Sequence, residues 1–379
     1  MSSPQGALEL SPEDLEQPFL LSPSEKHPSL TLKDYFGALQ KFILSHDGAI
    51  LFSALSKQNL QHIDVADISE VVISSEKHGA YYHIASIALR VLEKEVRFAI
   101  TTALSEPAKI SLEKEFFIMR QLIGLSPEFL PEIYSRETVT WSTESGAEEF
   151  VMMLGEWLDG YHEWHLNDNP ESGKRQIQLW DYDQGYRFLS KAESHEILRQ
   201  VAYILTYYYD PASFCEIYPW HHGAGDFVVK AESGALSVKL ITARQYEPLV
   251  HFDRVKEADH LVAAILFLLN LSLRVRLDRL DGVAGPAWID DSAVHAAVEG
   301  FFAGLQATSA TNRLLLGSLS GFLEILQSFD AQEILDMYES LLHIYAEEDQ
   351  DDFRLIQAKL AEHASLLHTV LQDYSLGKT

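Results

Sequence analysis

The residues of this chain that are best suited to chemistry lie in one short polar loop. His221 and Asp226 are five positions apart, and imidazole and carboxylate groups are side chains that move protons or bind metals at neutral pH. The loop runs directly into the apolar run Phe227–Val229, and Gly234 precedes a second run, Leu236–Ile241. Two such runs joined by a Ser-Gly turn predict a β-hairpin, with Asp226 at its base.

The histidines also allow a metal centre. His162 and His165 form an i, i+3 pair, and together with His221, His222 and Asp226 they offer nitrogen and oxygen ligands from two segments. Such ligands suit zinc or another divalent ion. The spacing differs from the His-Glu-x-x-His pattern of metallohydrolases, so hydrogen-bonded structural histidines are the competing interpretation.

Composition limits the classes of partner. The chain of 379 residues is 47% hydrophobic and has a formal net charge of −27, which is typical of a globular protein with an acidic surface. Such a surface repels the phosphates of nucleic acid and the headgroups of anionic membranes. We therefore expect no nucleic acid and no membrane as partner. A small molecule or a protein remains, and the sequence does not name it.

Several features favour a cytoplasmic location. The single cysteine, Cys215, excludes an internal disulfide and is typical of a reducing compartment. The acidic, Pro/Ser-rich N-terminus lacks the basic and apolar segments of a signal peptide. The longest apolar run, Leu261–Leu273, is interrupted by Asn270 and is too short to span a bilayer, so it predicts a buried helix.

The spacing of apolar residues along the chain predicts where its strands and helices lie. Three β-rich runs, a helix and two further apolar runs predict a five-stranded antiparallel sheet with one helix after its third strand. These elements are expected near 71–73, 83–92, 96–104, 110–123, 130–134 and 150–154. Farther along, helical spacing predicts helices over 193–208, 257–277, 292–305, 312–329, 331–346 and 352–374.

Five segments follow from these elements. They are a flexible acidic Pro/Ser-rich arm (1–30), a helical segment (31–66), a sheet-rich part (67–155), a mostly helical part (156–310) and a C-terminal helical extension (311–379). The acidic run Glu347–Asp352 is expected to be a solvated connector between the last helices. The fold class is α+β.

The order of these elements resembles the protein-kinase-like fold, in particular its aminoglycoside and choline-kinase branch. The resemblance covers about Ile68 to Leu305 and rests mainly on element order. Glu115–Met119 is similar to the family's inserted helix, and Leu154–Gly160 to the hinge that meets the adenine ring. Pro219–Ala243 is similar to the catalytic loop, hairpin and metal-binding turn. The resemblance implies a two-lobed phosphotransferase that uses ATP with Mg²⁺ or Mn²⁺.

The alignment of the loop decides the role of each residue. The family's loop has a catalytic Asp and, five positions later, a metal-binding Asn directly before the hairpin. Asp226 directly precedes Phe227, so this register makes Asp226 the metal ligand and places His221 at the position of the base. A second register makes Asp226 the base and leaves no metal-binding Asn before the strand.

Three positions depart from the family's pattern. Thr101 and Thr102 occupy the strand that should carry the phosphate-binding lysine. Thr242 replaces the magnesium-binding Asp after the hairpin, and the turn after the first strand has one glycine, Gly79, where the family has several. Phosphoryl transfer depends on cations that neutralise phosphate charge, so ordinary kinase catalysis is not expected.

Other residues could compensate at the nucleotide site. Lys77, Arg90 and Arg244 could reach a phosphate, Glu115 would pair with one of them, and Glu156 lies within the hinge. The leading interpretation is a degenerate kinase-fold protein, either a pseudokinase or a ligand-binding regulator that can bind nucleotide without efficient transfer. The alternatives are an atypical small-molecule phosphotransferase and a metal-dependent enzyme built on the histidine clusters.

Overall fold

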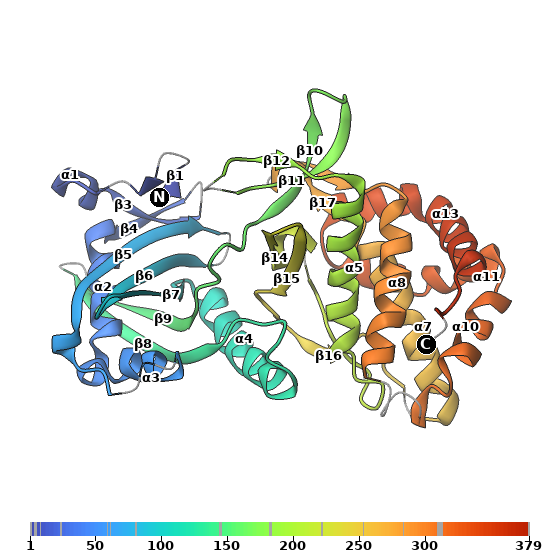
Figure 1. Ribbon diagram of the computed structural model, residues 1–379, viewed down its shortest axis with the longest axis horizontal. Coiled ribbons are helices and arrows are strands. Elements are labelled where there is room, and N and C mark those ends of the chain that lie inside the picture. Colours follow the sequence, from blue (N-terminus) through green and yellow to red (C-terminus); the bar gives the residue numbers. More distant parts are fainter. Residues whose placement is uncertain are drawn as a thin grey trace. The chain divides into compact units, whose positions relative to one another are not determined.

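The computed structural model describes residues 2–3, 6–7, 9–22, 25–58, 60, 62–79, 82–143, 146–181, 184–220, 223–252, 254–282, 284–308 and 314–377. The chain forms two compact units, Met1–Asp159 and Gly160–Thr379 (Figure 1). The first unit contains the sheet and the second is mostly helical. The α+β class expected from the sequence is therefore confirmed.

The first unit is built on a five-stranded antiparallel sheet in the order β5-β6-β7-β9-β8. Its strands are β5 (Ile68–His78), β6 (His83–Val91), β7 (Lys94–Ala103), β8 (Ile133–Thr143) and β9 (Gly146–Glu156). Helix α4 (Glu106–Leu125) connects β7 to β8. The predicted sheet, with one helix after its third strand, is thus confirmed.

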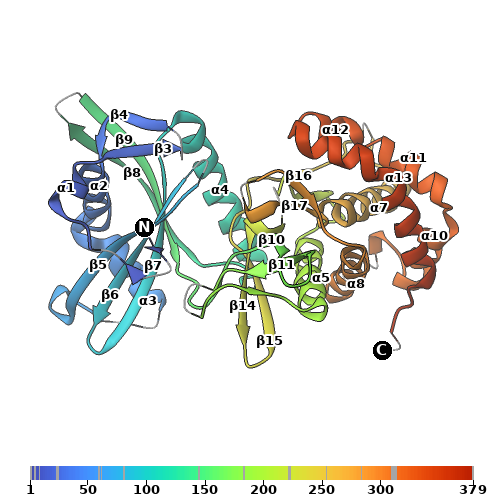
Figure 2. The ribbon, with the colours of Figure 1, turned by 90° about the horizontal axis from the view of Figure 1, so that it is seen from above.

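Both faces of this sheet are packed against helices. Successive residues of a strand point to opposite sides, so each strand supplies side chains to both interfaces. On one face, Ile87, Phe98 and Ile100 are fully buried in a core shared with α2 (Leu32–Ile43) and α3 (Ala49–Lys57). Helix α4 packs against β7, β8 and β9. Figure 2 shows the sheet between α2 and α4.

The N-terminal residues correct one expectation. Composition predicted a flexible arm over 1–30, but β3 (Pro18–Ser22) pairs with β4 (Glu25–Thr31). Phe19 and Leu30 are each 1% exposed, and the Phe19 ring lies 4.9 Å from that of Tyr35. Phe19 and Leu30 thus anchor this Pro/Ser-rich segment to the core. The shorter elements nearby are β1 (Ser2–Ser3), β2 (Gly6–Ala7), α1 (Pro12–Leu15), η1 (Ser45–Gly48) and η2 (Val65–Asp67).

Two segments predicted as helical are divided. Between α2 and α3, His46 and Asp47 have φ of 53° and 58°, a left-handed conformation that an α-helix of L-residues cannot continue. The helix expected over 331–346 is two helices, α11 (Ala331–Glu339) and α12 (Leu342–Ala346). In both places the hydrophobic period continues across a break in the backbone.

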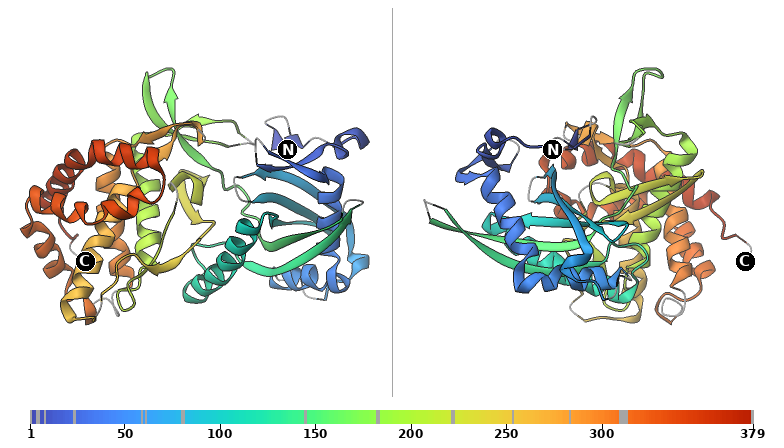
Figure 3. Two further views of the ribbon diagram at one scale, coloured as in Figure 1. Left: turned by 180° about the vertical axis from the view of Figure 1, so that it is seen from behind. Right: turned by 60° about the vertical axis from the view of Figure 1, so that its left-hand side comes forward.

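The second unit is mostly helical, as predicted. Its remaining longer helices are α5 (Lys191–Tyr207), α7 (Glu257–Arg274), α8 (Ser292–Ala307), α10 (Leu319–Ser328) and α13 (Gln350–Asp373). Seen from behind, α7 and α8 lie between the C-terminal helices and the small strands (Figure 3). None of the helices that the structure describes is long and apolar enough to cross a membrane.

Short antiparallel strands complete the second unit. They are β10 (Trp164–Asn169), β11 (Lys174–Leu179) and β12 (Arg187–Phe188), the pairs β13 (Cys215–Ile217) with β16 (Tyr246–Pro248) and β14 (Phe227–Glu232) with β15 (Ala235–Leu240), and β17 (Leu277–Arg279) with β18 (Pro286–Trp288). A further 3₁₀ turn, η3 (Leu280–Gly282), follows β17.

The β14–β15 pair is the hairpin predicted from the sequence. Phe227 lies opposite Leu240, and Val229 lies opposite Val238. The turn residues Ser233 and Gly234 have φ of 52° and 82°. Positive φ at both central residues matches the twist of a two-residue hairpin, which explains why the Ser-Gly pair was a sufficient signal.

Candidate functional site

The predicted loop ends in a buried ion pair at the base of the hairpin. Asp226 ends the single turn α6 (Gly223–Asp226), and its side chain is 1% exposed. Arg244, which follows β15, donates from Nη1 to Oδ1 of Asp226 at 2.8 Å. The backbone N–H of Ile241 donates to the carbonyl oxygen of Asp226 at 2.9 Å. The pairing of β14 with β15 therefore brings Asp226 and Arg244 together.

This ion pair changes what Asp226 can do. Arginine is charged at every physiological pH, and a hydrogen bond between charged groups is stronger than a neutral one. To act as a base or metal ligand, Asp226 would have to share or release Arg244. The Arg244 side chain is 32% exposed, so breaking this pair costs less than the roughly 3–5 kcal/mol typical of a fully buried ion pair. Thr242, at the position of the family's magnesium-binding Asp, is half-buried in the same segment and has no charge.

His221 and His222 lie outside the described residues. The choice between His221 and Asp226 as base therefore stays a prediction.

The other histidine pair lies beside the same hairpin. His162 exchanges two backbone hydrogen bonds of 2.9 Å with Val229, which form an isolated β-bridge on β14 of the hairpin. Its Nε2 lies 3.5 Å from Oδ1 of Asp181, and Nδ1 of His165 lies 3.3 Å from Oδ1 of Asp278. Within the described part of the chain, no three His, Cys, Asp or Glu side chains are grouped to hold a metal ion. Each histidine faces its own carboxylate, which favours the structural interpretation.

Asp278 was missed by the sequence analysis and joins β17 to β10. Its carboxylate accepts the backbone N–H of Leu166 at 2.6 Å and that of Arg279 at 2.8 Å, while the residue is 1% exposed. A buried carboxylate that accepts several N–H groups is satisfied without a ligand. Asp278 therefore positions His165.

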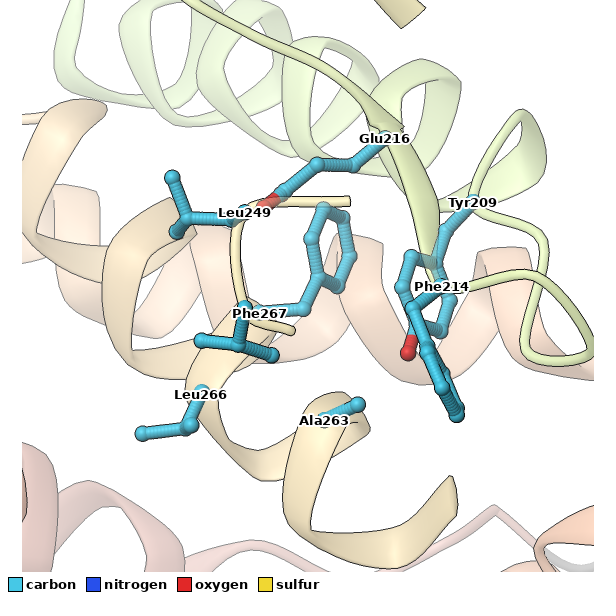
Figure 4. Close-up of a pocket in the computed structure, with 8 residues that line it drawn as sticks. Tyr209, Phe214, Glu216, Leu249, Ala263, Leu266 and Phe267 are labelled. Carbon is cyan, nitrogen blue, oxygen red and sulfur yellow. The ribbon is translucent and has the colours of Figure 1, made fainter. Parts of the chain in front are cut away.

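A second buried carboxylate, Glu216 on β13, was also missed. It lies at a small pocket lined mainly by apolar side chains (Figure 4). Burial raises its pKa well above the ordinary value, while a hydrogen bond with the Asn270 side chain acts in the opposite direction. Asn270 in turn accepts the hydroxyl of Tyr345 at 3.1 Å. The pocket volume is about 10 Å³, enough for about one water molecule. Burial in this apolar pocket therefore favours the protonated form of Glu216.

In the first unit, Lys77 and Arg90 do not converge on one phosphate. Lys77 lies opposite Ile84, next to the turn that contains Gly79. Arg90 is six positions farther along β6, roughly 20 Å away at the usual rise of a strand. Its side chain is 59% exposed and lies 3.2 Å from Glu70. A single phosphate therefore cannot contact both cations.

The other residues predicted for the nucleotide site are buried, bound to the backbone or packed in the core. Glu115 on α4 is 3% exposed. Glu156 ends β9, and its Oε2 accepts the backbone N–H of Glu132 at 3.0 Å. On β7, Thr102 is fully buried and shares the α2-facing side with Ile100, because the two are separated by one residue. A lysine in place of Thr102 would point into the core.

Arg97 is a cation on β7 that the sequence analysis did not select. Its guanidinium lies 4.4 Å from the centre of the Trp157 ring and 3.5 Å from Oε1 of Glu76. The Ser86 hydroxyl donates to the same oxygen at 2.5 Å. An indole and a carboxylate thus hold Arg97 in place. No local signal marked Arg97, because its partners come from β5 and from the segment after β9.

Comparisons with known proteins place the chain in no family. No protein-family model matches it, and no curated protein matches it. One solved structure found by shape, titled "Crystal structure of BubR1 kinase domain", is 11% identical with a TM-score of 0.27, covering 91% of this chain and all (100%) of that chain. Similarity at this level does not define a fold, so function is inferred from the residues of this chain alone.

Proposed function

We propose that this chain is a degenerate kinase-like protein that binds a ligand or partner as a regulator and does not transfer phosphate efficiently. The ion pair between Asp226 and Arg244 carries the proposal. The element order supports the kinase-like part: a five-stranded sheet with one inserted helix, then a helix, a polar loop and a hairpin. These elements were expected from the hydrophobic pattern and turn residues of the sequence.

Phosphoryl transfer needs positioned cations, and this chain has few to offer. A nucleotide's phosphates are normally held by a lysine and by metal ions on carboxylates. Here β7 carries threonines, Thr242 is uncharged, and Asp226 is engaged by Arg244. Each lost electrostatic contact typically costs about 3–4 kcal/mol in the transition state, so two together reduce the rate by roughly 10⁴-fold or more.

Thermal shift and phosphotransfer assays test the proposal. The melting temperature is measured with ATP alone, with Mg²⁺ or Mn²⁺ alone and with both, because a ligand that binds only the folded state raises it. We expect no metal-dependent shift from the unchanged chain and no release of γ-phosphate above the buffer rate. A shift with ATP alone would identify nucleotide as the regulatory ligand.

Two variants separate the ion pair from nonspecific charge effects. Arg244→Ala removes the partner of Asp226, and Arg175→Ala removes an exposed arginine on β11. Each is compared with its own unliganded form. If ATP with metal stabilises the unchanged chain and Asp226→Asn abolishes that shift, the proposal is wrong and the atypical phosphotransferase is the better interpretation.

A further inference from the structure

Among the residues that the structure describes, strand β5 pairs with no strand on its outer side and forms one edge of the first unit's sheet. It pairs with β6, and its register is regular over 70–75, between two irregularities. Val71 and Val72 are 45% and 46% exposed. Because neighbouring residues point to opposite faces, these valines flank the edge on both sides. β1 lies near β5 but pairs with β2.

The opposite edge, β8, is built differently. Its exposed side chains Thr138, Thr140 and Ser142 are polar. Lys41 from α2 donates to the carbonyl oxygen of Thr140 at 2.7 Å. Polar side chains and a charged group over the backbone are common ways to protect an edge strand from pairing. The two edges of one sheet thus differ: β5 exposes two adjacent valines beside Ser69, Glu70 and Lys77, whereas the exposed side chains of β8 are polar.

The turn beside β5 carries an exposed leucine in a strained conformation. Leu92, the first of two turn residues between β6 and β7, has φ of 56° and is 60% exposed. Glycine is favoured in such positions because a side chain strains the left-handed backbone. The Leu92 N–H donates to the carbonyl oxygen of Asp67 at 2.9 Å, which places Leu92 next to the last residue of η2. Val65, the first residue of η2, is 71% exposed. Val65, Val71, Val72 and Leu92 are called the β5 edge patch.

The surroundings of the β5 edge patch are acidic. Its neighbours in sequence and register include more carboxylates than cations: Asp64, Asp67, Glu70, Glu93 and Glu95 against Arg90 and Lys94. Five negative and two positive groups leave a local charge of −3. A second copy of the chain would bring the same acidic rim and a net charge of −27, so a basic partner fits better.

We propose that β5 accepts an extended, basic segment of a partner protein as an added strand. Backbone hydrogen bonds along 70–75 would hold it, as in other cases of strand addition. Its apolar side chains would cover Val71 and Val72, and its Lys or Arg side chains would meet the acidic rim. This proposal goes beyond the regulatory function above, since none of its residues belongs to the Asp226 site.

The experiment starts from random twelve-residue peptides displayed on phage and selected against the intact chain. The most enriched peptides are synthesised, and their affinities are measured by fluorescence anisotropy. We expect basic and apolar residues to alternate in them. Val72→Lys should weaken binding at least tenfold by repelling the peptide, whereas the matched control Thr138→Lys on β8 should leave it unchanged. Hydrogen exchange should slow at amides within 70–75.

Four outcomes of the peptide experiment would overturn the proposal. They are failure to select any peptide, selected peptides without basic residues, equal binding by Val72→Lys and the unchanged chain, and slowed exchange elsewhere than β5. Sedimentation tests the other occupant. A dimer of the unchanged chain that Val72→Lys dissociates would identify a second copy, not a basic partner, as the occupant of β5.

Discussion

Removing Arg244 should destabilise the second unit more than removing any exposed arginine there. Breaking a fully buried ion pair costs about 3–5 kcal/mol because the remaining charge is uncompensated. The Arg244 side chain is 32% exposed, so water can partly solvate Asp226 after truncation. We therefore expect Arg244→Ala to lower the free energy of unfolding by about 2–3 kcal/mol. For a unit of this size, that is a fall in melting temperature of roughly 4–12 °C.

A double-mutant cycle isolates the pair. Asp226→Asn removes the charge but keeps the shape and a hydrogen-bonding oxygen, so it should cost only about 1 kcal/mol. When Asp226→Asn has already removed the buried carboxylate, Arg244→Ala should lower the free energy of unfolding by much less than it does in the unchanged chain. The expected coupling energy between the two positions is about 1–2 kcal/mol. Urea unfolding followed by circular dichroism measures each term.

The matched control is Arg175→Ala. This arginine pairs with Asp168 at 3.4 Å, but the two side chains are 50% and 76% exposed. An exposed pair contributes at most about 1 kcal/mol. If Arg244→Ala costs no more than Arg175→Ala, or if the two substitutions of the cycle are additive, the ion pair does not hold Asp226.

Three further predictions concern packing and pH. Gly300→Ala should destabilise the second unit by about 1–3 kcal/mol, because an added Cβ would lie 2.3 Å from the carbonyl oxygen of Arg199. At Gly124 on α4 an added Cβ would meet no neighbouring atom within 4 Å, so Gly124→Ala should stabilise the first unit by about 0.5–1 kcal/mol. Equal effects of the two substitutions in calorimetry would contradict this. Burial raises the pKa of Glu216 well above 4.5, so above that pH the folded state holds a proton that the unfolded state loses. Stability therefore falls as pH rises above 4.5. Glu216→Gln should flatten this dependence of the urea midpoint on pH, and an unchanged profile would contradict it. Burial lowers the pKa of His363 to about 3 from 6.5. The neutral imidazole therefore contributes stability that is fully present above pH 6.5 and is lost as pH falls toward 3. His363→Gln should reduce this loss of stability in acid, and parallel curves of stability against pH for the variant and the unchanged chain would contradict it.

Local patterns were enough to predict the sheet, the inserted helix and the hairpin. Period-two runs separated by turns mark strands because alternate side chains face the core. Gly234 marked the hairpin because its turn needs positive φ. The position of Asp226 directly before β14 followed from the same local signals. Each of these features depends on residues close together in sequence.

Features that depend on distant residues were not predicted. Arg244 was selected as a phosphate ligand, and its contact with Asp226 appears only when the hairpin is folded. Glu216 is buried because β13 pairs with β16 and packs near α7, which no local pattern shows. Phe19 anchors an N-terminal segment whose composition is typical of disorder. In each case the deciding contact joins separate elements.

The C-terminal acidic run is the case with the largest consequence for the site. It was expected to be a solvated connector, but Glu348 accepts hydrogen bonds from Arg274 and from the hydroxyl of Tyr218. Arg274 is 3% exposed and also donates to Tyr218 at 2.7 Å. Tyr218 is three positions before His221, so the C-terminal helices support the segment that enters the candidate loop. Removing 311–379 would leave Arg274 without its carboxylate, and a buried charge without a partner is strongly destabilising. The C-terminal extension is therefore part of the structure that holds the candidate site.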